Sequence, residues 1–234
     1  MDVVYIYRAA DDGMLRASLR NLTAHYSALD RLIIVGDCPS WCQPDLVIPY
    51  EFGRIKTINM AQQMLAAARI LDSTFLEMND DFFLLSDYKP INYYYSSVAD
   101  YRTLHIQREG INYYNSAMVG LQGKYYDLHC PFRMDPVVLR RELPRWIQTN
   151  SSRGTFNTLH FTKTHLGNLQ HEPEEQVVAD FKLYDQRGLQ PQFLTEHNLQ
   201  YGLVSLDANN LDRIEPYLVN VPSRFEAKAT SLRR

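Results

Sequence analysis

The sequence predicts an α/β fold, with a mostly parallel central sheet flanked by helices in a single domain. Apolar runs of strand length at residues 3–7 and 32–37 are separated by a segment of helical periodicity. The second run has almost no polar alternation, which is typical of a strand buried on both faces of a parallel sheet. A later apolar run, residues 75–78, leads into the acidic cluster Asn79-Asp80-Asp81. Repeated strand, helix and strand segments favour right-handed parallel units.

The predicted elements of the first half follow this alternation. The expected strands are short and apolar and span residues 3–7, 32–37, 46–49 and 75–78. Asp11 or Asp12 can cap the first helix, whose apolar residues repeat at helical spacing. Thr57 or Asn59 starts the second helix, which precedes the acidic cluster.

The second half is less regular. We expect strands at residues 104–106, 126–132 and 203–207, and helices at residues 111–121, 135–146 and 172–184. Asp135 is expected to cap the second of these helices and Pro144 to interrupt it. Residues 222–234 are polar and basic, and we expect them to form a mobile tail.

Composition narrows the class of protein. The chain has 234 residues, of which 45% are hydrophobic and 22% charged, as in an ordinary globular protein. A net charge of −3 gives no general attraction to nucleic acid or to anionic membrane. No stretch approaches the roughly 20 apolar residues of a spanning helix, so we expect no membrane span and a cytoplasmic location. The cysteines, Cys38, Cys42 and Cys130, are too few for a disulfide framework.

Polar side chains follow the predicted strands where these strands end, at Arg8, Asp37 and Asn79-Asp80-Asp81. Ligands of open α/β sheets bind at the carboxyl ends of the strands, so we expect these residues to share one edge. There Arg8 would contact a nucleotide or its phosphates, and Asp37 would accept from a nucleobase or ribose. The alternatives are a surface salt bridge from Arg8 to Asp11 or Asp12, and a turn-forming role for Asp37.

The adjacent carboxylates of Asp80 and Asp81 repel each other, and burying either charge unpaired would cost several kcal/mol. Bound Mn²⁺ or Mg²⁺ would remove this cost, because hard divalent ions take carboxylate oxygens and keep positions open for phosphate oxygens. The alternative is that Asn79-Asp80-Asp81 forms a polar turn between two hairpin strands.

Asp127 and His129 fall on one face of the expected strand at residues 126–132, because residues two apart point the same way. An acid and an imidazole on one face suit general base catalysis or metal ligation. A half-buried strand with a solvated polar face explains the same spacing.

Two further basic positions are candidates. Lys56 lies ahead of the second helix, where it can hold phosphate oxygens. Residues 158–168 contain two histidines, a lysine and several hydroxyl groups, and His171 follows shortly after. Such residues bind phosphate or supply a late metal ligand.

Five short stretches follow one another across roughly the first 135 residues: residues 2–5, 15–22, 32–41, 79–83 and 128–132. In this order they resemble the nucleotide-sugar-dependent GT-A glycosyltransferases and, more narrowly, the Stealth-type sugar-phosphate transferases and their phage-encoded relatives. The Stealth pattern has a second acidic block near its C-terminus that is missing here, and residues 54–59 differ from that pattern. These departures favour the glycosyltransferase interpretation.

The resemblance implies one GT-A-like, Rossmann-related domain. Residues 1–125 would form its nucleotide-sugar-binding half and residues 126–221 its acceptor-side half, with a largely helical C-terminal part before the tail at 222–234. The implied site residues fall into three groups, for the donor, the metal ion and the acceptor. The donor would be bound by Arg8, Asp37, Lys56, Asn79 and Asp80, the Mn²⁺ or Mg²⁺ ion by Asp81, Asp80 and His171, and the acceptor hydroxyl would be activated by Asp127 with His129.

On this interpretation the chain is a metal-dependent glycosyltransferase that moves a sugar from a nucleoside-diphosphate sugar to an acceptor hydroxyl. The acceptor would be a glycan or a hydroxymethylated pyrimidine in phage DNA. If the protein is phage-encoded, its expected location is the host cytoplasm. Two alternatives stay open. One is a Stealth-type sugar-phosphate transferase acting on a capsular polysaccharide, and the other is a non-catalytic α/β nucleotide-binding module with a structural acidic turn.

Overall fold

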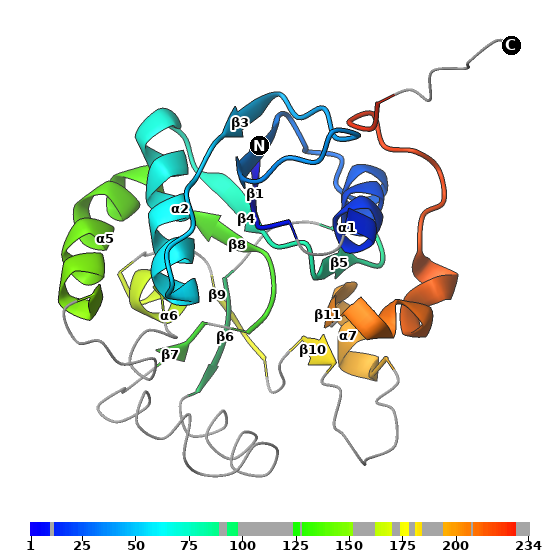
Figure 1. Cartoon of the computed structure of the whole chain (residues 1–234). Coiled ribbons are helices and arrows are strands. Elements are labelled where there is room, and N and C mark those ends of the chain that lie inside the picture. Colours follow the sequence, from blue (N-terminus) through cyan, green and yellow to red (C-terminus); the bar gives the residue numbers. More distant parts are fainter. Residues whose placement is uncertain are drawn as a thin grey trace, which may run out of the picture.

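The computed structural model describes residues 1–9, 12–88, 93–97, 124–126, 128–151, 162–169, 174–177, 181–183, 194–206 and 208–227. Its centre is a five-stranded sheet in the order β3-β2-β1-β4-β8 (Figure 1). These strands span Val3–Tyr7 (β1), Leu32–Gly36 (β2), Leu46–Ile48 (β3), Phe75–Met78 (β4) and Phe132–Met134 (β8). The first four run parallel, and β8 pairs with β4 in the antiparallel direction. The predicted α/β class with a mostly parallel sheet is therefore confirmed.

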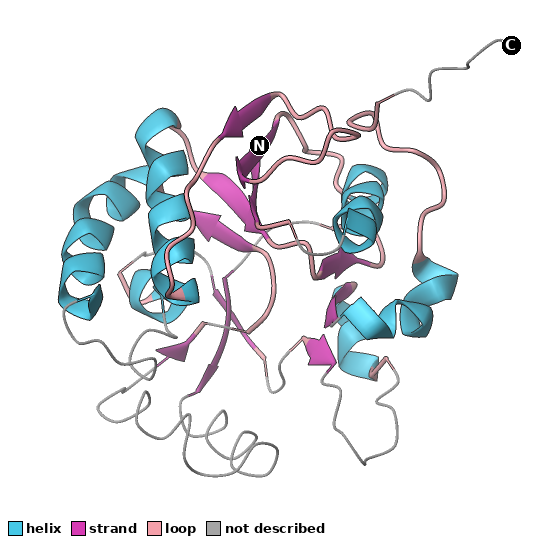
Figure 2. Cartoon of the chain, viewed as in Figure 1, coloured by secondary structure: helices cyan, strands magenta, loops and turns pink. Residues whose placement is uncertain are grey.

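Helices cover both faces of this sheet (Figures 1 and 2). On one side lies α1 (Asp12–His25), and on the other lie α2 (Lys56–Ile70) and α5 (Pro136–Ser151). Alternate residues of β1 face opposite layers: Tyr5 packs in the core formed with α1, and Val4 in the core formed with α2. Both faces are buried, which explains why the strand shows no polar alternation.

Two smaller sheets flank the central one. Strand β5 (Phe82–Leu84) pairs antiparallel with β11 (Leu203–Leu206), which pairs parallel with β10 (Lys182–Leu183). The other sheet joins β6 (Tyr93–Ser97) to β7 (Lys124–Tyr125) and β9 (Glu174–Gln176). The remaining described helices are short. They are α6 (Thr162–Gly167), α7 (Glu196–Tyr201) and the 3₁₀ helix η2 (Ala208–Tyr217).

Several expectations for the second half are wrong. The expected helix at residues 172–184 is replaced by β9 and β10 in the described residues of that range, although helices predominate among the other described residues of the C-terminal part. The expected strand at residues 126–132 is instead a bend at residues 128–130, and β8 begins after it. Pro144 lies inside α5, which continues through it. The elements expected at residues 104–106 and 111–121 lie outside the described residues.

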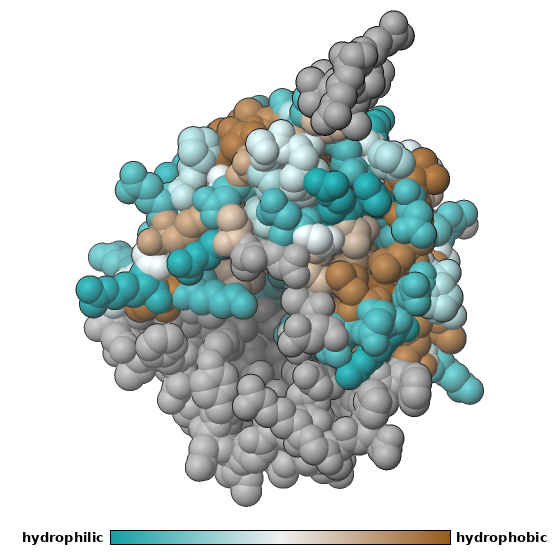
Figure 3. Space-filling model, turned by 45° about the vertical axis from the view of Figure 1, so that its right-hand side comes forward, coloured by the Kyte–Doolittle hydropathy of each residue, from teal (hydrophilic) through white to brown (hydrophobic). Residues whose placement is uncertain are grey.

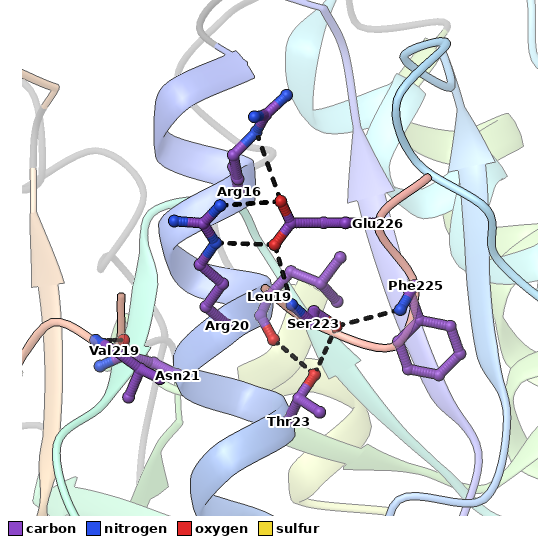
Figure 4. Close-up of polar contacts among 9 residues, drawn as sticks. All are labelled: Arg16, Leu19, Arg20, Asn21, Thr23, Val219, Ser223, Phe225 and Glu226. Carbon is purple, nitrogen blue, oxygen red and sulfur yellow. Dashed lines mark hydrogen bonds and ion pairs between the residues drawn. The ribbon is translucent and has the colours of Figure 1, made fainter. Parts of the chain in front are cut away.

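The chain after residue 221 corrects the expected start of the mobile tail. Residues 222–227 pack against α1, where Phe225 is buried and Glu226 forms hydrogen bonds with Arg20 (Figure 4). The Gln43 amide donates to the Phe225 carbonyl at 2.7 Å, and the Ala227 amide donates to the Trp41 carbonyl at 2.7 Å. The C-terminal segment therefore holds the loop that follows β2. Residues 228–234 lie outside the described residues.

The described surface is mixed in polarity, with hydrophobic patches separated by hydrophilic side chains (Figure 3). The exposed large hydrophobic residues lie on different elements: Val47, Ile70, Val137, Leu169, Leu199 and Val221. None of the helices in the described part of the chain is both long and apolar enough to cross a membrane.

Candidate functional site at the carboxyl edge of the sheet

The carboxyl ends of β1, β2 and β4 lie at one edge of the central sheet, because these strands are parallel neighbours. The chain moves from β1 through β2 to β3 on one side, and β4 lies on the other side of β1. A reversal of this kind opens a crevice beyond the strand ends, where open α/β sheets bind ligands. Arg8 follows β1, Asp37 follows β2 and Asn79 follows β4, so the expected convergence is present.

His129 approaches the same edge by a different route. Glu77 of β4 pairs with Phe132 of β8, and the two strands run in opposite directions. The start of β8 therefore lies beside the end of β4, and the bend that contains His129 comes directly before β8. His129 is partly buried and has a φ of 45°, a conformation that non-glycine residues adopt rarely. His129 therefore lies in a bend and not in the strand expected at residues 126–132, and Asp127 lies outside the described residues.

Asp37 joins the ends of β1 and β2. Its Oδ2 accepts a hydrogen bond of 2.8 Å from the Ala9 amide, and its own amide donates to the Tyr7 carbonyl at 3.2 Å. Gly36 precedes it with a φ of 124°, and a Cβ at that position would lie 2.0 Å from the Tyr7 carbonyl oxygen. Only glycine fits so close a passage, and it directs Asp37 across the two strand ends. Asp37 therefore has the turn-forming role that was the alternative expectation from the sequence, because it bonds the backbone at the end of β1.

Arg8 and Lys56 place positive charge near these strand ends. Arg8 is exposed, and its guanidinium carbon lies 5.2 Å from the centre of the Phe52 ring. Lys56 is exposed and is the first residue of α2, the helix that follows parallel strand β3. Because β3 ends at the carboxyl edge, α2 begins on that side of the sheet. Both residues are available to an anionic ligand there.

The acidic cluster forms a turn, in which the Phe82 amide donates to the Asn79 carbonyl at 3.2 Å. This turn links β4 to β5, and the two strands belong to different sheets, so it does not close a hairpin. Burial raises the pKa of the Tyr5 hydroxyl, and the negative charge of Asp80 raises it further. Asn79 and both aspartates are partly buried.

Asp81 points toward the neighbouring sheet. The hydroxyl of Ser205 in β11 donates to Asp81 Oδ2 at 3.0 Å, and the Lys182 ammonium in β10 lies 3.9 Å from the same oxygen. The Asp81 side chain remains 29% exposed, so an ion pair with Lys182 leaves it accessible to ligand. The two adjacent carboxylates therefore have different surroundings.

The sequence prediction did not include Lys182 or Ser205. A three-residue alternation of buried Phe181, partly buried Lys182 and buried Leu183 is the strand signal in this region, and it is too short to stand out. The pairing of Lys182 with Ser205 in β11 is a tertiary contact that no local pattern reports.

Trp41 is a second omission from the predicted site. Its indole Nε1 donates to Asp12 Oδ2 at 3.2 Å, and the guanidinium carbon of Arg16 lies 4.4 Å from the centre of its ring. The Tyr7 hydroxyl donates to the other oxygen of Asp12 at 3.0 Å. These contacts join the end of β1, the start of α1 and the loop after β2 into one polar and aromatic cluster beside Asp37.

The predicted metal ligands are only partly described. Within the described ranges, no group of three or more His, Cys, Asp or Glu side chains gathers closely enough to hold a metal ion. Asp127 and His171, the expected general base and late metal ligand, lie outside the described residues. The described donors are the carboxylates of Asp80 and Asp81, and oxygen donors of this kind suit Mg²⁺ and Mn²⁺.

No protein-family model matches this sequence, and no curated protein matches it significantly.

Proposed function

We propose that this protein is a metal-dependent glycosyltransferase that moves a sugar from a nucleoside-diphosphate sugar to an acceptor hydroxyl. The observation that supports it best is the convergence at the carboxyl edge. Arg8, Asp37 and the pair Asp80 and Asp81 follow three adjacent parallel strands, and the antiparallel β8 brings His129 to the same edge. The sheet order with β8 antiparallel beside β4 is compatible with a GT-A-like domain.

The donor would lie across the ends of β1, β2 and β4. Asp37 would accept hydrogen bonds from the nucleoside, since it already bridges β1 and β2. Arg8 and Lys56 would hold the phosphate oxygens, because both are exposed cations at this edge. Asp80 and Asp81 would hold Mn²⁺ or Mg²⁺, which when bound neutralises charge on the departing diphosphate.

The acceptor side would be formed by the bend before β8. We assign the general base on the acceptor hydroxyl to Asp127, with His129 as its partner. The acceptor class is a glycan or a hydroxymethylated pyrimidine in DNA. A gel shift with duplex DNA that weakens steeply as salt rises would support the DNA acceptor, because phosphate contacts release counterions.

A second candidate is transfer of a sugar phosphate, and the position of His129 supports this reaction as well as the first. An imidazole at the edge that carries the acidic turn can act on a phosphoryl group as well as on a hydroxyl. The products separate the two reactions. Sugar-phosphate transfer releases a nucleoside monophosphate, whereas glycosyl transfer releases a nucleoside diphosphate.

The test is a thermal-shift screen of UDP, GDP, CDP and dTDP sugars with and without Mn²⁺. A ligand that binds the native state must raise the melting temperature. We expect a rise of several degrees for one nucleotide, only with metal, and its loss in Asp81→Asn. The matched control is Asp72→Asn, an exposed aspartate in the loop that leads into β4 at the opposite edge, which should keep the shift. No shift with any nucleotide would overturn the proposal, and a shift without turnover would indicate a binding module.

A further inference from the structure

A buried ion pair lies beneath the candidate site. Lys163 of α6 places its ammonium 2.7 Å from Glu77 Oε2, and the two side chains are 6% and 0% exposed. Glu77 is in β4, so the pair is attached to the strand that leads into Asp80 and Asp81. Ion pairs buried this deeply seldom add stability over an apolar pair of similar volume, because both charges must be desolvated. Their position therefore calls for another explanation.

The explanation is a second contact of Lys163. Its ammonium also donates to the Cys130 carbonyl at 3.0 Å and lies 4.9 Å from the centre of the Phe82 ring. Cys130 ends the bend that contains His129, and Phe82 begins β5 directly after the acidic turn. One ammonium group thus contacts the strand before the acidic turn, the strand after it and the bend beside it.

The next residue of α6 holds the other end of the same bend. The Tyr126 amide donates to the Thr164 hydroxyl at 2.9 Å, and Thr164 is fully buried. The Leu128 amide donates to the Tyr126 carbonyl at 2.9 Å, which closes the bend on itself. Two consecutive residues of α6 therefore hold Tyr126 and Cys130, on either side of His129.

His129 is the residue that this arrangement controls. Leu128 and Cys130 on either side of it are buried, so the backbone cannot turn without disturbing the core. A non-glycine residue with positive φ is strained, and it persists only where its surroundings impose it. The bonds from Lys163 and Thr164 are such surroundings.

We propose that Lys163 is a positioning residue that fixes His129 relative to Asp80 and Asp81, with Glu77 holding its charge in place. This inference rests on the proposed function, in which His129 acts at the acceptor side. Lys163 itself touches no reacting atom. It fixes the position of the bend relative to β4. The rate of catalysis depends steeply on such positions, because a misplacement of about 1 Å lowers the rate about a hundredfold.

The test replaces the pair rather than one partner. In Glu77→Leu/Lys163→Met both charges are removed at similar volume, so the variant is expected to fold, with a melting temperature lowered by the loss of the buried hydrogen bond to the Cys130 carbonyl. The bond to Cys130 is lost, and we expect exchange of the Tyr126 and Leu128 amides to accelerate about tenfold or more. We expect kcat to fall about 10- to 100-fold, with the donor KM within about threefold. Asp37, Arg8 and Lys56, which would hold the nucleoside and the phosphate oxygens of the donor, lie outside β4 and α6, which explains the split.

The matched control removes another ion pair of the same sheet at its opposite edge, Asp2 with Arg31. Asp2→Asn/Arg31→Met should change stability and leave both the amide exchange and kcat unchanged. Thr164→Val releases the other end of the bend and should also accelerate exchange, which provides a test if the double variant does not fold. Unchanged exchange and kcat in a folded Glu77→Leu/Lys163→Met variant would overturn the inference. Failure of the wild type to turn over any sugar nucleotide would overturn the proposed function instead, while the exchange measurement still decides whether Lys163 holds the bend.

Discussion

Arg20 of α1 and Glu226 near the C-terminus are joined by two parallel hydrogen bonds of 2.7 and 2.8 Å (Figure 4). The Ser223 amide donates to the same carboxylate at 2.9 Å, and the Glu226 side chain is only 8% exposed. Charge-assisted, two-pronged bonds of this kind are the stronger class of side-chain contact. The C-terminal segment is thus part of the folded domain, and it holds the loop that carries Trp41.

This contact predicts a pH-dependent stability. The hydrogen bonds from Arg20 hold the pKa of the Glu226 carboxyl below its ordinary value of 4.5. Because the folded pKa is the lower one, the stabilisation is present above about pH 4.5 and is lost as the pH falls through the folded pKa. Glu226→Gln should therefore cost about 1–3 kcal/mol at pH 6 and much less at pH 3. Urea unfolding at both values measures it, with the exposed Glu215→Gln as control. Equal costs at the two pH values would contradict this account.

Truncation of the chain tests the same C-terminal segment by removing it. Removal of residues 223–234 deletes the Glu226 bonds and the buried Phe225 ring, and should cost about 3–5 kcal/mol of unfolding free energy. Removal of residues 228–234 alone is the control, because that variant keeps Phe225 and Glu226. In a Trp146→Phe background, the longer truncation should shift Trp41 emission to the red, because the Ala227 bond to its carbonyl is lost. Unchanged emission would show that the loop is held by its contacts with Asp12 and Arg16.

The sequence predicts those parts of the fold whose burial is local and regular. Val3–Tyr7 and the helix containing Leu15 and Leu19 show their strand and helix character directly, because every apolar position has a core to face. The acidic turn is placed correctly for the same reason, since an apolar strand delivers it to the edge of the sheet.

The errors occur where distant contacts decide the local structure. Residues 172–184 have the polar composition of a surface helix, yet Gln176 pairs with Tyr95 and Lys182 pairs with Ser205 in sheets. The bend at His129 depends on Lys163, which lies 33 positions away from Cys130 in the chain. Such pairings have no signature in a single sequence. The sequence therefore predicts the strand ends and names His129 as a candidate, but it gives neither the bend around His129 nor β10.

Gly36 provides a test of how the strand ends are arranged. Alanine there would combine a φ of 124° with a Cβ 2.0 Å from the Tyr7 carbonyl oxygen. We expect Gly36→Ala to lower the free energy of unfolding by about 2–4 kcal/mol, measured by urea denaturation. The control is Gly53→Ala, where the nearest atom to the added Cβ is a side-chain oxygen of Asn59 at 3.2 Å. A loss no larger than that of the control would show that β1 and β2 can separate at this edge at little cost.

Lys182 should compete with a divalent ion for Asp81. Its ammonium lies 3.9 Å from Asp81 Oδ2, and both side chains are partly exposed, so its charge opposes that of a metal ion bound there. We expect Lys182→Met to bind Mn²⁺ about 3- to 10-fold more tightly than the wild type at low salt, since the carboxylate loses a fixed cation. Calorimetric titration with Mn²⁺ alone measures the change.

Two variants decide where that ion binds. Lys124→Met removes a lysine of another sheet, whose ammonium lies over the Tyr95 ring, and should leave Mn²⁺ affinity unchanged. In Lys182→Met/Asp81→Asn the gain should disappear, because the carboxylate that Lys182 neutralises is no longer charged. If the gain persisted without the Asp81 charge, the ion would bind at another carboxylate, and Asp80 would replace Asp81 as the principal ligand. If Lys182→Met bound Mn²⁺ no more tightly than the wild type, the ion pair of β10 with the acidic turn would be structural and the metal site would lie elsewhere.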